Sequence, residues 1–275
     1  RLFVALKGQN KQAAIEEIEH SKILDELGSP FYSCGRRIHA AIAYATFGMF
    51  CEARRSLSEL REIVSVHYPL HESYFHFTRA FVAIREQNVL ETRDALERGF
   101  ETAKLVGGPG GVGWMLGQTA EILSTALELD IETGTAQDWI RRMQLTCPDP
   151  TLSQWPWPIK IFTLGKFLVL KDDIPLSFGK KAPKRLLQLL KAIVVFGGEN
   201  VSKEKLLDAI WPDEDAASAT DTLKVSVGRL RTLLGNDAAI EIQGGHVSLN
   251  RRICWVDLYA FESIKDDAHQ EAGDG

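Results

Sequence analysis

The sequence contains little cysteine and no long apolar run. Its four cysteines, Cys34, Cys51, Cys147 and Cys254, form no Cys-x-x-Cys pair, whereas a structural zinc site needs paired ligands and a secreted disulfide scaffold needs far denser cysteine. The apolar runs fall short of the ~18 residues that cross a bilayer, and the first residues lack the charged-then-apolar pattern of a signal peptide. These absences predict a cytoplasmic protein with free thiols, no metal and no membrane contact.

Motifs of catalysis and cofactor binding are missing as well. The glycine-rich stretch 107–113 lacks the Gly-Lys-Ser/Thr ending of a phosphate-binding loop. His67, His71 and His76 are spaced so that they do not share one helix face, which argues against a metal site there. Because the sequence also shows no nucleophile–base pair, we expect the protein not to be an enzyme and to use no cofactor.

No sign of charge predominates strongly, because 32 basic residues stand against 37 acidic ones, a formal net charge of −5. For the whole chain this balance argues against nucleic acid as a partner, since DNA binding normally leaves a basic surface. Proline is sparse too, but four of the ten prolines lie in residues 147–158, CPDPTLSQWPWP. Proline prevents a helix from continuing, so this stretch is interpreted as a linker between two domains.

Residues 1–146 carry their apolar residues almost entirely at helical spacing. The pattern predicts helices near 2–6, 12–27, 35–47, 51–66, 72–86, 90–106, 114–129 and 135–145. Aligning residues 53–57 (ARRSL) with 92–96 (TRDAL) gives an offset of 39 residues, and at that offset Ala14 falls on Ala53. We therefore expect an all-α helical-repeat domain of the tetratricopeptide (TPR-like) type, a fold that usually binds peptides or proteins.

The pattern changes after the proline-rich stretch. Alternating apolar residues predict short strands near 159–161, 167–169 and 176–178, then a hairpin over 239–250 and a further strand over 253–257. Between them lie three predicted helices, near 184–196, 203–211 and 216–234. We assign residues 159–262 to an α+β domain and residues 263–275 to an acidic, flexible tail.

Strands, three helices and a closing hairpin are the order of a winged helix. The sequence resembles the DNA-binding domain of OmpR-type response regulators and, more closely, that of bacterial transcriptional activators of the antibiotic-regulatory (SARP) class. The residues that carry this resemblance are LGKFLVLKDDIPL, KRLLQLLKAIVVFGGENVSKEKLLDAIWPD, LKVSVGRLRTLLG and VDLYAFE. The resemblance covers about residues 158–262, and it departs from the usual Gly-Tyr of the wing at Gly245-His246.

When charge is counted separately for each part of the chain, it no longer argues against DNA as a partner. Residues 159–262 hold 15 basic and 13 acidic residues, whereas residues 1–158 and 263–275 are both acidic. An inward stripe of Leu223, Val227, Leu230 and Leu234 turns the other face of the third helix outward. The candidate DNA-binding residues on that helix are Thr222, Lys224, Val225, Ser226, Arg229 and Arg231. The candidates elsewhere are Lys181, Lys184, Arg185, Lys203, Trp211, His246 and Arg251.

Some of these roles come from the resemblance, and two of them stay open. Arg229 and Arg231 match the Arg-Leu-Arg of the family's DNA-reading helix, in which an arginine can read guanine through two hydrogen bonds. Trp211 is either a core residue or a donor to a DNA phosphate. Arg252 is either a wing contact or an ordinary surface charge.

The resemblance implies a bacterial transcription regulator, an activator that binds double-stranded promoter DNA and contacts RNA polymerase. Helical repeats beside such a DNA reader are similar to those of the maltose-regulator (MalT-like) group, so we expect the repeats to relay a protein or small-molecule signal. Because Arg1 starts within a helix pattern, the chain is expected to be a fragment of a larger regulator, with an ATPase module upstream. A homodimer is a further possibility. The alternative is a protein-interaction adaptor whose winged helix docks a protein instead of DNA.

Overall fold

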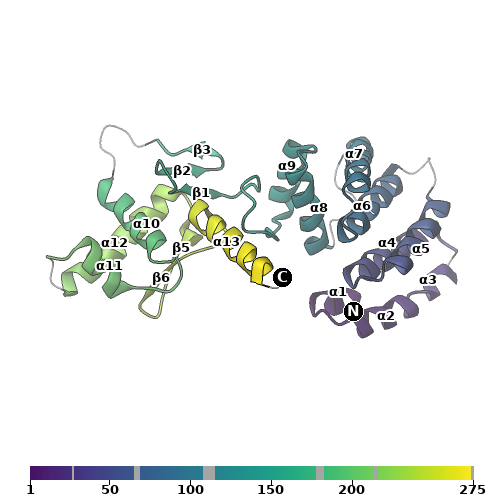
Figure 1. The fold of residues 1–275 in the computed structure, drawn as a ribbon, viewed down its shortest axis with the longest axis horizontal. Helices are drawn as coiled ribbons and strands as arrows, with labels where there is room; N and C mark the ends of the chain where they lie inside the picture. Colours follow the sequence, from purple (N-terminus) through teal and green to yellow (C-terminus); the bar gives the residue numbers. More distant parts are fainter. Residues whose placement is uncertain (27, 65–68, 108–114, 178–182, 214–215, 274–275) are drawn as a thin grey trace. The chain divides into compact units, whose positions relative to one another are not determined.

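The computed structural model describes residues 1–26, 28–64, 69–107, 115–177, 183–213 and 216–273 of the 275-residue chain (Figure 1). The chain divides into two compact units, Arg1–Pro148 and Asp149–Gly275. No helix in these ranges is both long and apolar enough to span a membrane.

The regular secondary structure in the described residues of the first unit is helical, as the sequence predicts. Its helices are α1 (Leu2–Lys7), α2 (Lys11–His20), α3 (Ile23–Glu26), α4 (Pro30–Thr46), α5 (Phe50–Ile63), α6 (Pro69–Arg85), α7 (Val89–Val106), α8 (Leu116–Glu128) and α9 (Thr133–Met143). The helix predicted over 12–27 is instead two helices, α2 and α3. At the break, the Ser21 hydroxyl donates to the carbonyl of Ile18 at 2.6 Å, and such a side-chain bond competes with helix continuation.

The 39-residue offset is visible in the backbone of the turns that join α1 to α2, α4 to α5 and α6 to α7. In each turn one N–H donates to the carbonyl oxygen five residues earlier, and the residue before the donor has a positive φ. The three bonds are Asn10 to Ala5, Met49 to Tyr44 and Asn88 to Ala83, at 2.8–2.9 Å. The three positive-φ residues are Gln9, Gly48 and Gln87.

The same offset recurs in the side chains that face the helix partner. Ala14 and Ala53 are fully buried, and Thr92 is 3% exposed. Each lies four residues after the donor of its turn, where only a small side chain fits between closely packed helices. The turn from α8 to α9 repeats the bond, from Ile131 to Ala126 at 2.8 Å. The first unit is therefore a succession of helix pairs with a common turn.

The second unit is an α+β fold with two small sheets. Strands β1 (Ile159–Phe162), β2 (Leu168–Lys171), β3 (Ile174–Pro175) and β7 (Cys254–Val256) form one sheet, in the order β3-β2-β1-β7. Strands β4 (Val201–Ser202), β6 (His246–Leu249) and β5 (Ile240–Gln243) form the other, in the order β4-β6-β5. The strand expected over 253–257 is confirmed, and it pairs parallel to β1. The third strand lies at Ile174–Pro175, just before the expected range 176–178, whose residue 178 falls outside the described residues.

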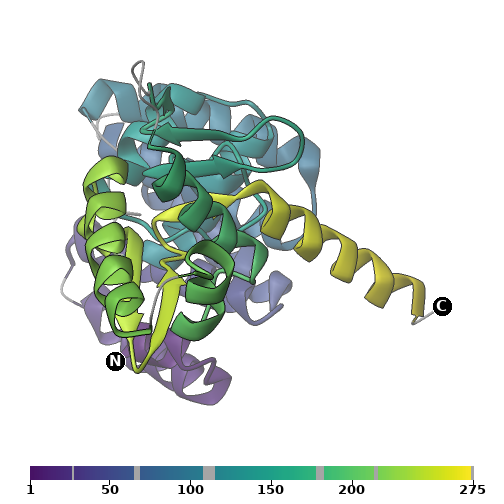
Figure 2. The same cartoon turned by 90° about the vertical axis from the view of Figure 1, so that its left-hand side faces the viewer.

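Three helices lie between β3 and β5 in the sequence, and a fourth ends the unit. They are α10 (Lys184–Val195), α11 (Lys203–Ile210), α12 (Ala216–Leu234) and α13 (Asp257–Gly273). Helices α10, α11 and α12 contact one another, and α10 also contacts β6 of the hairpin (Figure 2). The three helices and both sheets share one core. Its fully buried residues include Ile161 of β1, Leu190 of α10, Leu206 of α11, Leu230 of α12 and Val247 of β6. Three helices, this core and a β5–β6 hairpin are the parts of a winged helix.

The proline-rich segment does not behave as a simple linker. The second unit begins at Asp149, and two hydrogen bonds fix the segment within it. The indole N–H of Trp157 donates to the carbonyl of Leu152 at 2.9 Å, and that of Trp255 donates to the carbonyl of Pro150 at 3.0 Å. Leu152, Trp155 and Trp157 are buried, because apolar residues among the prolines give the segment a surface to pack.

The acidic tail expected over 263–275 is also different. Helix α13 continues to Gly273, since no proline interrupts it and Asp257 fixes its start. The Asp257 carboxylate accepts hydrogen bonds from the backbone N–H groups of Thr163, Leu164 and Leu258 at 2.8–2.9 Å. The start of α13 is thereby tied to the end of β1, and its last turns extend away from the sheet (Figure 2).

Candidate nucleic-acid interface

Helix α12 turns one face into the core and the other to solvent. Leu223, Val227, Leu230 and Leu234 are at most 1% exposed, so the predicted inward stripe is confirmed. Thr222, on the flank of the helix, is half-buried. The exposed residues of α12 between Asp221 and Thr232 are Asp221, Lys224, Val225, Gly228, Arg229 and Thr232. We call these six residues the outer face of α12.

The two cations of the outer face differ in their surroundings. Lys224 Nζ lies 3.3 Å from the carboxylate of Asp221, one turn earlier. The guanidinium of Arg229 makes no hydrogen bond or ion pair with any described residue. Val225 is apolar yet 53% exposed. The outer face therefore offers one uncommitted guanidinium and one apolar side chain to a partner.

Two residues predicted to face DNA from this helix are turned elsewhere. Ser226 is only 9% exposed, because its position around the helix falls beside the buried stripe and not opposite it. Arg231 is half-buried, and its Nε donates to the carbonyl of Ile240 at 2.9 Å. That bond joins α12 to the first residue of β5, so Arg231 positions the hairpin.

A second group of predicted contacts lies at the start of α10. Lys184 and Arg185 are exposed in its first turn, where free backbone N–H groups also favour phosphate. Lys181 falls outside the described residues. The first turn of α10 is thus a basic surface on the same unit as α12.

The predicted DNA contacts on and beside helix α11 are less exposed than the sequence predicts. Ser202 caps it as expected, by accepting from the N–H of Lys205 at 3.2 Å. Lys203 is half-buried, and its backbone N–H donates to the carbonyl of Gly245 at 3.0 Å. Trp211 is 4% exposed within the hydrophobic core, so of its two predicted roles the structure favours the core residue.

The β5–β6 hairpin ends in a tight turn. Gly244 and Gly245 have φ of 56° and 86°, conformations that favour glycine. His246 is exposed, and its Nδ1 lies 3.0 Å from the carbonyl oxygen of Gly244. Arg252 is exposed, and its backbone N–H donates to Asn250 Oδ1 at 2.9 Å, but its guanidinium makes no hydrogen bond or ion pair with the described part of the chain. The imidazole Nε2 of His246 and the guanidinium of Arg252 therefore stay available to a partner.

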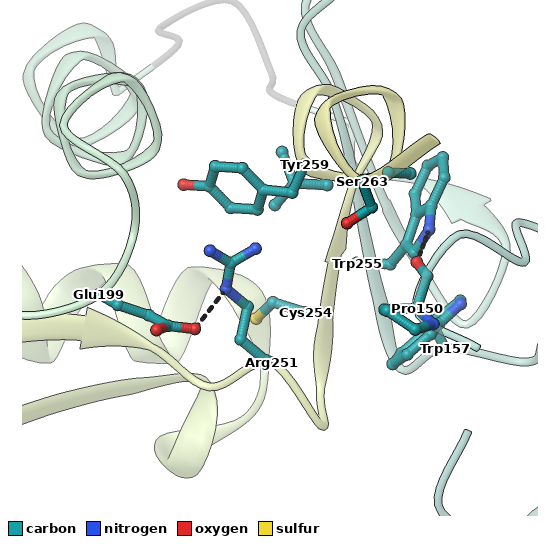
Figure 3. Close-up of a pocket in the computed structure, with 10 residues that line it drawn as sticks. Pro150, Trp157, Glu199, Arg251, Cys254, Trp255, Tyr259 and Ser263 are labelled. Carbon is teal, nitrogen blue, oxygen red and sulfur yellow. Dashed lines mark hydrogen bonds and ion pairs between the residues drawn. The ribbon is translucent and has the colours of Figure 1, made fainter. Parts of the chain in front are cut away.

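Arg251, predicted beside the wing, belongs to a structural cluster instead (Figure 3). Its Nε donates to the Glu199 carboxylate at 2.8 Å, and its Nη2 donates to the carbonyl of Gly197 at 3.1 Å. The guanidinium carbon lies 3.6 Å from the centre of the Tyr259 ring. A cavity of about 320 Å³ separates this cluster from Trp255. Arg251 therefore holds β6, the α10–β4 turn and α13 together.

Sequence reasoning did not foresee the partners of this cluster. Tyr259 is 8% exposed, and burial raises its pKa to about 12, so its hydroxyl stays protonated as a donor. Burial also raises the pKa of the neighbouring Cys254 thiol to about 12. The one available signal was Tyr259 within the VDLYAFE motif, because a tyrosine on an apolar helix face commonly carries a buried hydrogen bond.

No metal centre is found in the described parts of the chain. Of the three histidines considered from the sequence, His67 falls outside these parts. His71 packs against the rings of Phe31 and Tyr74. His76 Nε2 lies 3.3 Å from the Glu72 carboxylate, and burial lowers its pKa. Both histidines thus pack within the helical unit.

A comparison with curated proteins gave no match, and neither did a comparison with solved structures. The family model described as "Transcriptional regulatory protein, C terminal" matches residues 181–244. The match runs from just before α10 to the turn of the hairpin, and it includes the whole outer face of α12. Over residues 181–244 the second unit is therefore similar to the OmpR-type winged-helix DNA-binding domain that forms the C terminus of transcriptional regulatory proteins, and its α+β fold is consistent with a winged helix.

Proposed function

We propose that the chain is a transcription activator that reads promoter DNA with the outer face of α12. The observation that carries the proposal is the combination on that face of uncommitted Arg229 with exposed Val225. An arginine in the major groove can bind guanine through two hydrogen bonds, and an apolar side chain can contact a thymine methyl group. The basic first turn of α10 and Arg252 beside the hairpin supply contacts to phosphate.

The first unit has a separate role in this proposal. Its succession of helix pairs with a common turn supports a tetratricopeptide-like array, which relays a protein or small-molecule signal to the DNA reader. The mild positive charge of residues 159–262 predicts modest affinity for DNA by one chain alone, which favours action as a dimer. Contact with RNA polymerase follows from the proposed activator role.

Binding to DNA is tested by electrophoretic shift of genomic promoter fragments with the full chain at several salt concentrations. We expect affinity to fall steeply with salt, because each neutralised phosphate releases counterions. Absence of any salt-sensitive binding overturns the proposal and favours the adaptor alternative, in which the outer face of α12 docks a protein.

Base reading is tested by comparing two exposed cations of the same unit. Arg229→Ala should weaken binding to a preferred site about tenfold or more while leaving binding to random DNA nearly unchanged, because a bidentate base contact contributes about 1–3 kcal/mol of discrimination. Lys184→Ala should weaken binding to every sequence alike. Equal effects of Arg229→Ala on all sequences would contradict its assignment to base reading.

A further inference from the structure

Gly228 lies at a position in α12 where glycine lowers the stability of the helix. It lies in the middle of the helix, on the exposed side, and a Cβ at this position would meet no described atom within 4 Å. Its φ is not among the positive ones, so alanine fits the same backbone without strain. Glycine is a much poorer helix former than alanine. Nothing in the described part of the chain therefore accounts for a glycine here.

Gly99 in α7 shows the contrast. A Cβ at Gly99 would lie 3.0 Å from the Phe77 ring, so a neighbouring helix requires the absence of a side chain. At Gly228 the space that a side chain would fill opens to solvent. A partner that approaches the helix backbone would account for a glycine at this point.

Helix geometry places Gly228 near the centre of the outer face. At about 100° per residue, it lies between Lys224 and Val225 around the helix, one turn before Thr232. The Thr232 hydroxyl donates to the Gly228 carbonyl at 3.1 Å, so that carbonyl is not left for a ligand. At Gly228 the outer face therefore has no side chain, and the neighbouring Val225 is apolar and exposed.

We propose that Gly228 marks the closest approach of α12 to DNA and that the space left open by the missing side chain, beside Val225, accommodates a thymine methyl group. This inference rests on the proposed function of the same helix. The thymine methyl is the apolar group that a base pair displays in the major groove, and it projects toward the bound helix. A Cβ on Gly228 would occupy the space of that methyl group.

The test uses the full chain and a duplex that it selects from a random DNA pool. Dissociation constants are measured for the original chain and for Gly228→Ala on this duplex. They are measured again on duplexes in which single thymines are replaced by deoxyuridine, which removes only the methyl group. Gly117→Ala is the matched control, because Gly117 is an exposed glycine of α8 whose Cβ would also meet no described atom within 4 Å.

For the original chain, deoxyuridine at one position should weaken binding about fourfold, the equivalent of one buried methyl group. Gly228→Ala should bind the thymine duplex at least tenfold more weakly. On the deoxyuridine duplex it should bind better than on the thymine duplex, so that the effect of the methyl group changes sign. Its melting temperature should rise by about 3 °C, which excludes misfolding as the cause. Gly117→Ala should leave DNA binding unchanged.

The outcomes separate the inference from the proposed function. If no duplex is selected at all, the proposed function fails, and the inference fails with it. If the original chain binds its duplex and Gly228→Ala binds equally well, only the inference is overturned. A loss of binding by Gly228→Ala that no deoxyuridine substitution relieves would also overturn the seat for a methyl group.

Discussion

The hydroxyl of Tyr259 donates a buried hydrogen bond to the carbonyl oxygen of Val194 at 2.8 Å. Val194 lies in the last turn of α10 and Tyr259 in the first turn of α13, so one bond joins the first and last helices of the second unit. Gly198 lies directly against the phenol, with a φ of 72°, and a Cβ there would overlap the Tyr259 hydroxyl.

Removing the Tyr259 hydroxyl should lower the free energy of unfolding modestly. Tyr259→Phe is expected to cost about 1 kcal/mol, because Val194 loses one of its partners. Gly198→Ala should lower the free energy of unfolding by about 2–4 kcal/mol. The alanine would have to adopt the left-handed conformation of Gly198, and its Cβ would overlap the Tyr259 hydroxyl. In the Tyr259→Phe background the cost of Gly198→Ala should shrink. Urea unfolding of the four proteins measures the coupling, and strictly additive costs would contradict the overlap.

Substitutions of the two adjacent arginines after the hairpin should have different effects. Loss of Arg251 should lower stability, whereas loss of Arg252 should weaken DNA binding. Arg251→Ala should lower the free energy of unfolding by about 1 kcal/mol, because it breaks the ion pair with Glu199 and uncovers Tyr259. Arg252→Ala should change stability by less than about 0.5 kcal/mol and reduce the salt dependence of DNA binding by about one phosphate contact. Thermal melts and salt titrations of both variants check the assignment, which an exchange of the two effects would refute.

Asp257 should be the most sensitive surface carboxylate of the second unit. Asp257→Ala removes the acceptor for three backbone N–H groups and for the Thr163 hydroxyl at 2.8 Å. We expect a loss of about 2–3 kcal/mol, because hydrogen bonds to a charged group at a helix start are among the stronger ones. Asp266→Ala, at an exposed position of the same helix, is the control and should change stability by less than about 0.5 kcal/mol.

Asp25 should make the first unit sensitive to acid. Burial raises its pKa, but hydrogen bonds from Arg36, Arg37 and Ser33 outweigh burial and lower the pKa to about 2, from an ordinary value of 3.8. A lowered pKa stabilises the fold fully above the unfolded value and loses that contribution as pH falls from about 4 to about 2. Asp25→Asn should therefore destabilise the chain by about 1 kcal/mol at pH 6, a figure reduced for partial exposure. The difference in the free energy of unfolding between the original chain and Asp25→Asn, measured by urea unfolding, should disappear at pH 2–3. A difference that does not change with pH would contradict the lowered pKa of Asp25.

The helices and the inward face of α12 were predictable because they depend on local periodicity. The helical spacing of apolar residues such as Leu223 and Val227 indicates a buried stripe, whatever residues pack against it. Arg251 was misjudged because its partners, Glu199 and Tyr259, come from distant parts of the chain, and no local pattern distinguishes a paired arginine from a free one. Lys160 in β1 illustrates the same limit. Alternation predicts it to be solvated, yet it is 7% exposed and pairs with Asp173 at 2.5 Å.

The hydrogen bond from Arg231 to Ile240 has a geometric consequence for any duplex that the protein meets. It fastens α12 to β5, while the bond from Lys203 to Gly245 fastens the opposite end of the hairpin to α11. Helix and hairpin are thus set at one separation by the protein itself, before any ligand arrives. In the proposed function, the DNA segments that meet α12 and the hairpin must therefore lie at that separation, and we expect a single base pair inserted between them to deprive one of the two elements of its contacts.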